Sequence, residues 1–597
     1  MSERADAATN AGAVQAVGWC DRRVRGRCDT PTVSSRFLAA VAALSVIVSA
    51  CAGATPTTEP SVSPRTIEPS QAAAPSPPAC PETAAPAADD PWWVDRVFYE
   101  VFVRSFADSD GDGIGDLRGL TQRLDYLNDG DPATTDDLGV TGLWLMPVAE
   151  SPSYHGYDVV DYRAVESDYG TADDFRALVA AAHDRGIAIV TDFVINHTSR
   201  EHPWFHDART PKSEHDDWYV WADEHPGIAR PDGNRVWHPD GERLYYGYFW
   251  EGMPDLNLEN PEVTAELGAI GDFWLEDMGV DGFRIDAARH LIEDGRQLEN
   301  TGATFEWLGD FHGHLKATHP DALVLGEVWD ASSMSSRYVR EGALDLTFDF
   351  ALASATITSL RSGDAGSLEA SLQEVAERYP RGGLATFLTN HDQDRIMSEL
   401  DSDVEAARQA ATLLLTGGGT PFVYYGEEIG LTGRKPDERI RTPMRWDPSE
   451  PAAGFSDAVP WEPLGDDPPG TDVATEAADP DSLLSGYRSL IHLRAAHPAL
   501  ASGDVLAVDA DAPSVVAYLR HFPGQSVLVV ANLGDEPVAA PVLSLGGGPL
   551  CGTPKARVVH GTGDAGAPVV DATGGFDAYV PLARLGPHET VVIELGR

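Results

Sequence analysis

Short apolar runs alternate with longer segments of helical periodicity over most of the chain. The eight runs that are rich in β-branched and large apolar residues span residues 97–103, 142–147, 187–193, 280–286, 323–328, 344–350, 384–389 and 420–425. Between them, segments such as 171–185, 261–278 and 404–415 place apolar side chains on one face of a helix. Strands that alternate with helices form parallel sheets, so eight of them predict an α/β fold of the (β/α)8 TIM-barrel type.

Two regions depart from this alternation. Residues of about 197–260, between the third and fourth strands, are too many for a simple crossover and are crowded with Trp, Tyr and His. They predict a subdomain inserted over the barrel mouth, within a barrel domain at 91–498. From residue 499 to 597, β-branched runs alternate with Gly and Pro clusters, which predicts a C-terminal antiparallel β-domain. Its β-rich runs are 515–519, 526–531 and 590–593.

The first 50 residues have the character of a signal peptide. Several arginines precede an apolar run at 37–48, which suits a signal core and is too short for a comfortable membrane span. The run ends in Val48-Ser49-Ala50-Cys51, which resembles a bacterial lipobox whose cysteine receives a diacylglycerol. The alternative is an ordinary cleaved signal with a chance cysteine. We expect a lipoprotein exported to the cell surface, or released outside the cell.

Residues 51–90 are rich in Pro, Ala, Thr and Ser, and they predict a flexible linker between the lipid-anchored Cys51 and the barrel. Contact with the membrane is then expected only through the lipid. Export leaves Cys80 and Cys551 as the ordinary cysteines in an oxidising compartment, where they can pair or stay free.

The chain is strongly acidic. It has 94 acidic against 43 basic side chains and a formal net charge of -51, which repels polyanions. This balance argues against nucleic acid or an anionic membrane surface as a partner, whereas a neutral substrate is indifferent to it. We expect a monomer.

Three carboxylates lie where a TIM barrel collects its functional side chains, at the carboxyl ends of strands. Asp286 ends the fourth strand in Gly-Phe-Arg-Ile-Asp, Glu327 ends the fifth in Leu-Gly-Glu-Val-Trp, and Asp392 follows the seventh in Thr-Asn-His-Asp-Gln. Separately each signal is weak, because such an Asp is more often a helix cap and such a Glu is usually just solvated.

In this order the three carboxylates resemble the α-amylase family of glycoside hydrolases, and the segments at 155–158 (His-Gly-Tyr-Asp) and 191–197 (Thr-Asp-Phe-Val-Ile-Asn-His) match it too. The resemblance extends from about residue 91 to the end of the chain. It implies a retaining mechanism with Asp286 as nucleophile, Glu327 as general acid and base, and Asp392 holding the sugar hydroxyls. Retaining hydrolysis requires two carboxyl groups roughly 5 Å apart, which neighbouring strand ends can supply.

The resemblance also implies substrate-binding residues. His197 and His391 would hydrogen-bond the sugar at the cleavage site, and Tyr157 would stack on its apolar face. Arg284 lies two residues before Asp286 on the same face of the strand and would keep that aspartate ionised. A structural ion pair is a compatible role for this arginine.

Residues 108–116 place acidic side chains at alternate positions around glycines, the arrangement that calcium needs for an all-oxygen shell. The segment is similar to the calcium loop after the first strand in many oligoglucosidases and some amylases of the family, and the alternative is a solvated acidic turn. The implied ligands are Asp108, Asp110, Asp112, the Ile114 carbonyl and Asp116. Asn196 and His290 match positions that hold a second calcium in many amylases, but the divergent insertion leaves that site unassigned.

Other segments bear on the kind of family member. Residues 253–257 (Met-Pro-Asp-Leu-Asn) resemble neopullulanases and intermediate amylases, whereas Ala287 is usual where α-1,4 bonds are cut. Arg289-His290 is similar to the amylase Lys-His pair, with arginine replacing lysine at the leaving-group side.

We therefore expect an endo-acting α-amylase for starch and maltooligosaccharides, with α-glucosidase and neopullulanase or cyclomaltodextrinase as alternatives. A non-catalytic, α-glucan-binding surface lipoprotein is a remote alternative, because such proteins usually lose the carboxylates that this chain retains.

Overall fold

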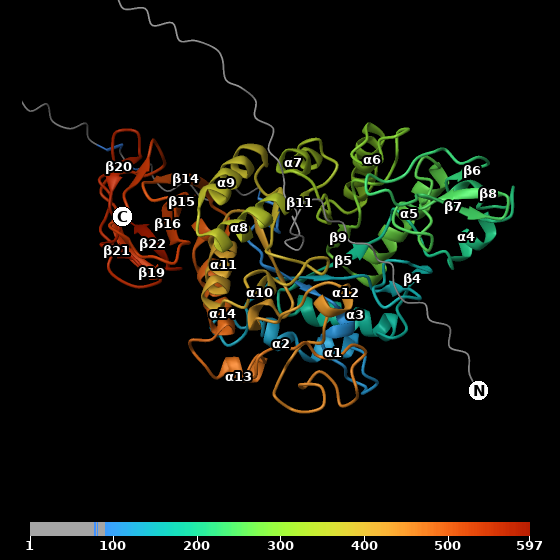
Figure 1. Ribbon diagram of the computed structural model, residues 1–597, viewed down its shortest axis with the longest axis horizontal. Coiled ribbons are helices and arrows are strands. Elements are labelled where there is room, and N and C mark those ends of the chain that lie inside the picture. Colours follow the sequence, from blue (N-terminus) through green and yellow to red (C-terminus); the bar gives the residue numbers. More distant parts are fainter. Residues whose placement is uncertain (1–76, 79, 81–89, 597) are drawn as a thin grey trace, which may run out of the picture. The chain divides into compact units, whose positions relative to one another are not determined.

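The computed structural model describes residues 77–78, 80 and 90–596, and its centre is a closed barrel of eight parallel strands (Figure 1). In chain order the barrel strands are β1 (Phe98–Val101), β2 (Gly142–Leu145), β5 (Ala188–Phe193), β9 (Gly282–Ile285), β10 (Leu323–Gly326), β11 (Leu346–Phe348), β12 (Leu384–Thr386) and β13 (Thr420–Tyr424). Each falls inside one of the eight predicted runs, and the fold class is confirmed. The predicted signal peptide, Cys51 and most of the predicted linker lie outside the described residues.

The barrel encloses side chains rather than a pore. Phe98, Trp144, Leu325, Phe348 and Phe422 are buried together inside it, and the rings of Phe98 and Phe422 stack 4.7 Å apart. Bulky apolar side chains directed inward from neighbouring strands explain why the strands read as nearly continuous apolar runs.

Helices follow most strands and cover the barrel. The longer ones are α3 (Ala172–His183), α5 (Pro261–Phe273), α6 (Gly302–Thr318), α7 (Ser332–Arg340), α8 (Phe350–Ser362), α9 (Gly366–Arg378), α11 (Val404–Thr416) and α14 (Leu483–Ala496). Local chemistry sets their starts: Thr171 and Asp174 form a reciprocal capping box on α3, and Asn260 caps α5 ahead of a proline. The predicted segment 261–278 ends differently, because its last turn widens into the π-helical η3 (Trp274–Met278).

The chain between β5 and β9 forms the predicted insertion. It contains α4 (Pro203–Ala208) and a three-stranded sheet with the order β6-β8-β7, made of β6 (Trp221–Ala222), β7 (Trp237–Asp240) and β8 (Arg243–Tyr246). Bridges between His197 and Asp255, and between Tyr219 and Leu256, join the two ends of the insertion. Its start and its return to the barrel therefore lie side by side, next to the ends of the strands that carry the candidate site.

The C-terminal part is a seven-stranded sheet with the order β19-β22-β16-β15-β14-β18-β20, in which every paired strand is antiparallel. Its strands are β14 (Asp504–Ala510), β15 (Val515–Phe522), β16 (Gln525–Asn532), β18 (Leu543–Leu545), β19 (Lys555–His560), β20 (Phe576–Tyr579) and β22 (Thr590–Gly596). It packs on the barrel through Tyr518, whose hydroxyl lies 2.7 Å from the Thr416 hydroxyl, and through buried Arg520, which donates to the Thr416 carbonyl at 2.8 Å. A disulfide joins Cys80 to Cys551.

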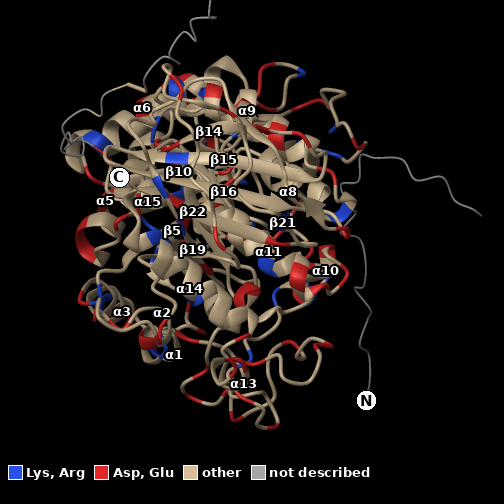
Figure 2. Cartoon of the chain, turned by 90° about the vertical axis from the view of Figure 1, so that its left-hand side faces the viewer, with Lys and Arg blue, Asp and Glu red and all other residues tan. Residues whose placement is uncertain are grey.

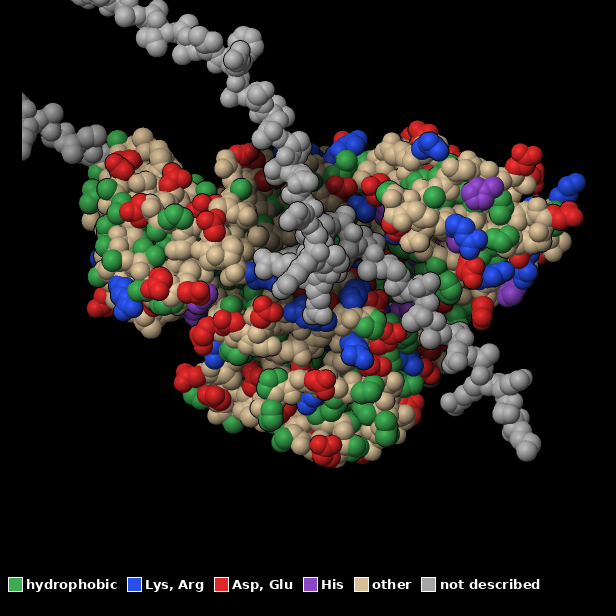
Figure 3. Space-filling model, in the orientation of Figure 1, with side chains coloured by type: hydrophobic (Ala, Val, Ile, Leu, Met, Phe, Trp, Pro, Cys, Tyr) green, Lys and Arg blue, Asp and Glu red, His purple; other side chains and the backbone are tan. Residues whose placement is uncertain are grey.

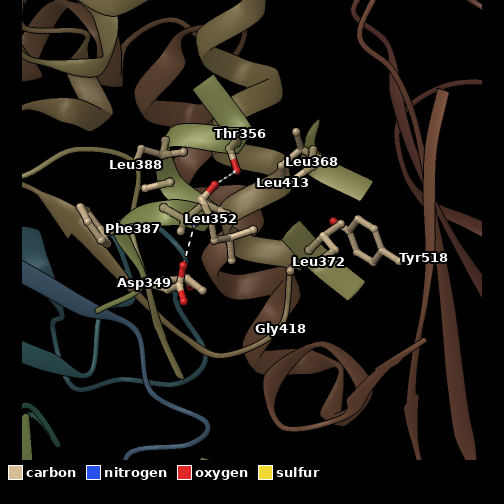
Figure 4. Close-up of a pocket in the computed structure, with 14 residues that line it drawn as sticks. Asp349, Leu352, Thr356, Leu368, Leu372, Phe387, Leu388, Leu413, Gly418 and Tyr518 are labelled. Atoms are coloured by element: carbon tan, nitrogen blue, oxygen red, sulfur yellow. Dashed lines mark hydrogen bonds between the residues drawn. The ribbon is translucent and has the colours of Figure 1, made fainter. Parts of the chain in front are cut away.

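A small apolar cavity lies where the barrel helices meet this sheet (Figure 4). It measures about 30 Å³ and is lined by α8, α9 and α11 together with Tyr518. Side chains such as Leu352, Leu372 and Leu413 surround it, and this volume is far too small for a sugar ring. It is a packing void between domains, and the candidate chemistry lies elsewhere.

Acidic side chains are spread over the face shown in Figure 3 rather than gathered in one patch, and they are frequent in the loops around α13 (Val473–Ala477) in Figure 2. In the part of the chain that the structure describes, no helix is both long and apolar enough for a membrane crossing.

Candidate active site

The guanidinium of Arg284 joins three carboxylates at the carboxyl ends of neighbouring strands. Its Nη1 lies 2.6 Å from Asp192 Oδ1 and 2.6 Å from Asp286 Oδ1, and its Nη2 lies 2.9 Å from Glu327 Oε2. β9 runs between β5 and β10, and Arg284 is the register partner of both Asp192 and Leu325. The barrel register therefore brings together the predicted residues Arg284, Asp286 and Glu327.

Burial and charge act in opposite directions on this cluster. The Arg284 side chain is 1% exposed, so its charge acts in a low dielectric. Burial raises the pKa of both Asp286 and Glu327, and the Arg284 guanidinium opposes the rise. Such a coupled pair is suited to hold one proton, with the ionised partner stabilised by the arginine.

The backbone after Asp286 helps to orient Glu327. Ala287 adopts a positive φ of 50°, and its amide donates to Glu327 Oε2 at 3.0 Å. The same oxygen also contacts Arg284 Nη2, so the Ala287 amide and the Arg284 guanidinium both bind Glu327 Oε2. Glu327 is thereby oriented by groups from the adjacent strand while its carboxyl remains beside that of Asp286.

His391 lies between acidic groups on the far side of the site. Its Nδ1 donates to Glu100 Oε1 at 2.6 Å, and its Nε2 lies 2.7 Å from the Tyr157 hydroxyl and 3.3 Å from Asp392 Oδ2. Although burial alone would lower the pKa of this histidine, the Asp392 and Glu100 carboxylates raise it to about 9. His391 is therefore a protonated hydrogen-bond donor at neutral pH.

Asp392 is held ionised. Burial alone would raise its pKa, but His391 and Arg441 keep the pKa well below its usual range. Arg441 Nη2 donates to Asp392 Oδ1 at 2.8 Å, and Arg441 Nε donates to the His391 carbonyl at 2.9 Å. One arginine from the loop after β13 thus orients both predicted residues that follow β12.

Tyr157 and His197 complete the predicted set. The Tyr157 ring stacks on that of His391 with centroids 5.6 Å apart, and its hydroxyl donates to Asp192 Oδ2 at 3.2 Å. His197 Nε2 lies 3.1 Å from the Tyr157 carbonyl, and burial lowers the pKa of this histidine to about 4. His197 is therefore neutral. All seven catalytic and substrate-binding residues predicted from the sequence meet at one mouth of the barrel.

Four further residues of the site had no role assigned from the sequence, namely Glu100, Trp144, Asp192 and Arg441. Glu100 and Asp192 are acidic residues within apolar strands, and that signal could have found them. Trp144, whose indole donates to Asp192 Oδ2 at 3.1 Å, looks like any other core residue. Arg441 lies in a loop without a pattern.

The acidic loop at residues 108–116 brings carboxylates together as expected of a cation site. Oxygen atoms of Asp108, Asp110 and Asp116 lie within 4.8 Å of one another. Asp112 is outside this group and accepts a hydrogen bond from the Ile114 amide at 2.8 Å. The oxygen donors fit calcium, which prefers carboxylates and carbonyls over nitrogen ligands.

A second group of oxygens lies buried where the insertion meets the barrel. Asn196 Oδ1, Asp255 Oδ2 and Glu293 Oε1 are all buried without a hydrogen-bond partner among the described residues. Burial raises the pKa of Asp255, and the neighbouring Glu293 raises it further. Orphaned carboxylate and amide oxygens fit a hard cation, and Asn196 is one of the two positions noted in the sequence.

This arrangement can cleave a glycosidic bond. It provides two neighbouring carboxyl groups of raised pKa on one guanidinium, with the ionised Asp392 and the protonated His391 as partners for hydroxyl groups of a ring. Those are the requirements of retaining glycoside hydrolysis.

Comparisons with known proteins agree with the site. Residues 100–503 match the family model described as alpha amylase, catalytic domain. "Alpha-amylase 3" of Dictyoglomus thermophilum is 38% identical over 453 residues, covering 74% of this chain and 86% of that protein. "Oligo-1,6-glucosidase" of Parageobacillus thermoglucosidasius is 31% identical over 529 residues, covering 74% of this chain and 91% of that protein. The solved α-amylase from H. orenii is 39% identical with a TM-score of 0.70, covering 84% of this chain and 99% of that one.

Proposed function

This chain belongs to the α-amylase family of glycoside hydrolases, and from that premise we propose that it hydrolyses internal α-1,4-glucosidic bonds of starch and maltooligosaccharides with retention. The observation that carries the proposal is the single buried guanidinium of Arg284, which contacts both Asp286 and Glu327.

The roles follow from the contacts and charges. Asp286 attacks the anomeric carbon while Glu327 gives its proton to the leaving glycosidic oxygen. The new bond between Asp286 and the anomeric carbon is a glycosyl ester. Glu327 then removes a proton from water, the water oxygen bonds to the anomeric carbon, and the Asp286 carboxylate leaves. Arg284 stabilises the anionic form of Asp286 in both steps. Asp392, kept ionised by His391 and Arg441, would bind ring hydroxyls as the ring flattens.

Endo-acting α-amylase is favoured over the other activities of the family. The relatives named α-amylase are 38–39% identical to this chain, whereas the oligo-1,6-glucosidase is 31% identical. An α-glucosidase is the second candidate, because several relatives above 30% identity bear glucosidase names. A binding-only role is disfavoured by the complete set of carboxylates around Arg284.

The product profile of the purified protein from residue 52 onward tests these alternatives on starch, maltotriose and pullulan. Rapid loss of iodine staining with mixed maltooligosaccharides is the expected result. Glucose alone, released from chain ends, would reassign the protein to the α-glucosidases, and panose from pullulan to the neopullulanases. No product on any substrate would favour the binding protein.

Calcium is the cation proposed for the loop at 108–116. Asp108, Asp110 and Asp116 would hold it, with Asp112 and the Ile114 carbonyl completing the oxygen shell. When bound, the ion would neutralise clustered carboxylates and brace the loop, so its role is structural. The buried oxygens of Asn196, Asp255 and Glu293 would suit a second calcium.

The protein is proposed to act outside the cytoplasm as a monomer, anchored through an acylated Cys51 or released. The Cys80–Cys551 disulfide supports export, because disulfides persist in oxidising compartments. Replacing Cys51 by Ser should move the protein from the membrane fraction to the soluble one. An unchanged membrane fraction would argue against the lipid anchor, and a mass above one chain in light scattering would argue against the monomer.

A further inference from the structure

Two histidines and two acidic residues form a cluster on the outside of the barrel, where α5 packs against α6. Asp272 lies in α5 and Glu276 in η3, whereas His314 lies in α6 and His319 ends that helix. Each of these segments ends shortly before the start of the next barrel strand, β9 or β10. The cluster is therefore at the opposite end of the barrel from the carboxylates of the candidate active site, and it has no part in the proposed reaction.

The imidazole nitrogens of this cluster lie at the distances that separate the ligands of one metal ion. His319 Nε2 is 3.3 Å from Asp272 Oδ1 and 3.6 Å from Glu276 Oε1, and His314 Nε2 is 3.9 Å from Asp272 Oδ2. In a tetrahedral zinc site with nitrogen and oxygen ligands, neighbouring ligand atoms are about 3.3 Å apart. The observed approaches are close to that value, and Asp272 faces one histidine with each of its oxygens.

One of these nitrogens lacks a partner within the protein. His319 Nε2 is buried and forms no hydrogen bond with any described residue, although two carboxylates lie near it. A buried polar atom without a partner costs free energy and calls for an explanation. The lone pair of a neutral imidazole cannot bond directly to a carboxylate, whereas a cation between the two groups would bind both.

The backbone around the cluster departs from regular helix at the positions that carry it. Gly268 leaves room for the His314 ring, because a Cβ at residue 268 would lie 2.9 Å from His314 Nε2. Glu276 lies in η3, and such π-helical turns are frequent at functional sites. His319 leaves the helical conformation with φ -130° and ψ 74°. Local structure thus places all four side chains at one junction between α5 and α6.

We propose that these four residues, Asp272, Glu276, His314 and His319, bind one zinc ion. Imidazole nitrogens together with carboxylates suit zinc, whereas calcium takes oxygen ligands, so this site and the loop at 108–116 differ in the metal they select. The His314 and Glu276 side chains are 50% and 66% exposed, and they are free to turn toward an ion held by Asp272 and His319.

The ion would join the two helices that lead into the catalytic strands. α5 and η3 precede β9, which Asp286 follows, and α6 precedes β10, which Glu327 follows. A ligand that binds only the folded chain stabilises it, so zinc would hold α5 and α6 together. The formal net charge of -51 favours the approach of a divalent cation. This inference is independent of the proposed glycosidase function.

Isothermal titration with zinc chloride tests the site on the protein from residue 52 onward. The protein is purified without a histidine tag and saturated with calcium, so that sites made of oxygen ligands alone are filled. The wild type should bind one zinc ion tightly, and His319→Ala should weaken this binding by about 100-fold, because even the outer partners of a metal ligand contribute about 10–100-fold. His225→Ala removes an exposed histidine of the insertion, and this matched control should bind zinc like the wild type.

Two milder variants keep the test valid if His319→Ala does not fold. His314→Ala and Glu276→Gln change exposed side chains, and each should also weaken zinc binding. Zinc should raise the Tm of the calcium-saturated wild type by a few degrees and should raise that of the variants less. Absence of tight zinc binding to the wild type would overturn the site, as would equal zinc affinity in the wild type and in either of these two variants.

Discussion

Arg284 is the residue on which the others of the site depend. Its guanidinium lies at the centre of three carboxylates that would otherwise repel one another in a buried site. Burial raises the pKa of Glu327, which suits a group that must hold a proton until the glycosidic oxygen leaves.

Replacing Glu327 by Gln should remove the proton donor without removing the nucleophile. We expect kcat on starch to fall by about 10²–10⁴-fold, the usual contribution of a general acid. With maltosyl fluoride, whose leaving group needs no proton, the variant should release a rapid burst of fluoride and then stall. Asp286→Asn should show no burst. Normal starch turnover in Glu327→Gln would rule out its role as the acid.

Asp392 and Glu100 together keep His391 protonated. The pKa of His391 is raised to about 9 although burial opposes the rise, so the stabilisation from its protonated form is complete below the ordinary pKa near 6.5 and is lost as the pH rises through 9. Removing the Glu100 charge should bring that loss to lower pH.

In Glu100→Gln, the alkaline limb of the kcat/KM profile should therefore move down by about one pH unit. The acidic limb, which depends on Asp286, should move less. The pH–rate profiles of the two enzymes measure this, with Asp577→Asn, an exposed change in β20, as control. An alkaline limb that stays in place would show that His391 does not govern it.

A helix cap and one close contact with a distant loop shape the acidic loop at residues 108–116. Asp116 caps α1 (Leu117–Gln122) by accepting from the Gly119 amide, and Gly113 adopts a φ of 95° beside the Val459 carbonyl, where a Cβ would lie 2.2 Å from that oxygen. Only glycine fits such a close backbone approach. The loop is thus shaped by local turns and by its contact with a distant loop.

Asp110→Asn should remove one calcium ligand from an exposed position of this loop. We expect the number of calcium ions bound per chain, measured by isothermal titration, to fall by one and the rise of Tm on adding calcium to shrink by a few degrees. Asp131→Asn, in another exposed acidic turn, is the control. Equal stoichiometry in the wild type and Asp110→Asn would exclude the loop as a calcium site.

The two domains of the described chain share a buried interface, because side chains of the C-terminal sheet such as Val516 and Val529 belong to the same apolar core as the barrel helices. Arg520 and Tyr518 reach from the β-domain to the end of α11, and the Cys80–Cys551 disulfide closes a span of 471 residues. Cross-links across long spans restrict the unfolded chain most.

Loss of this disulfide should therefore lower stability while leaving the barrel chemistry in place. The double variant Cys80→Ser/Cys551→Ser should unfold at a Tm a few degrees lower, corresponding to about 2–4 kcal/mol. A reductant should lower the Tm of the wild type to that of the variant and should not affect the variant. Free thiols detected in the wild type, together with a wild-type Tm that reductant does not change, would contradict the Cys80–Cys551 pairing.

The sequence by itself determined the barrel and most of the site. The sequence shows apolar runs, helix caps and turn glycines directly, because each depends on residues that are close together along the chain. All eight strands and the carboxylates at their ends could therefore be predicted. Local patterns did not reveal the π-helical end of the segment at 261–278 or the small sheet of the insertion.

Only the tertiary structure decided the contacts between distant segments. Glu100 and His391 are 291 residues apart, Arg441 contacts Asp392 from another loop, and the Trp329 ring stacks on that of Phe350. Such contacts depend on how the barrel closes, and closure is set by the packing of the whole chain. A single sequence carries no local trace of them, which is why charge and orientation in this site became clear only in three dimensions.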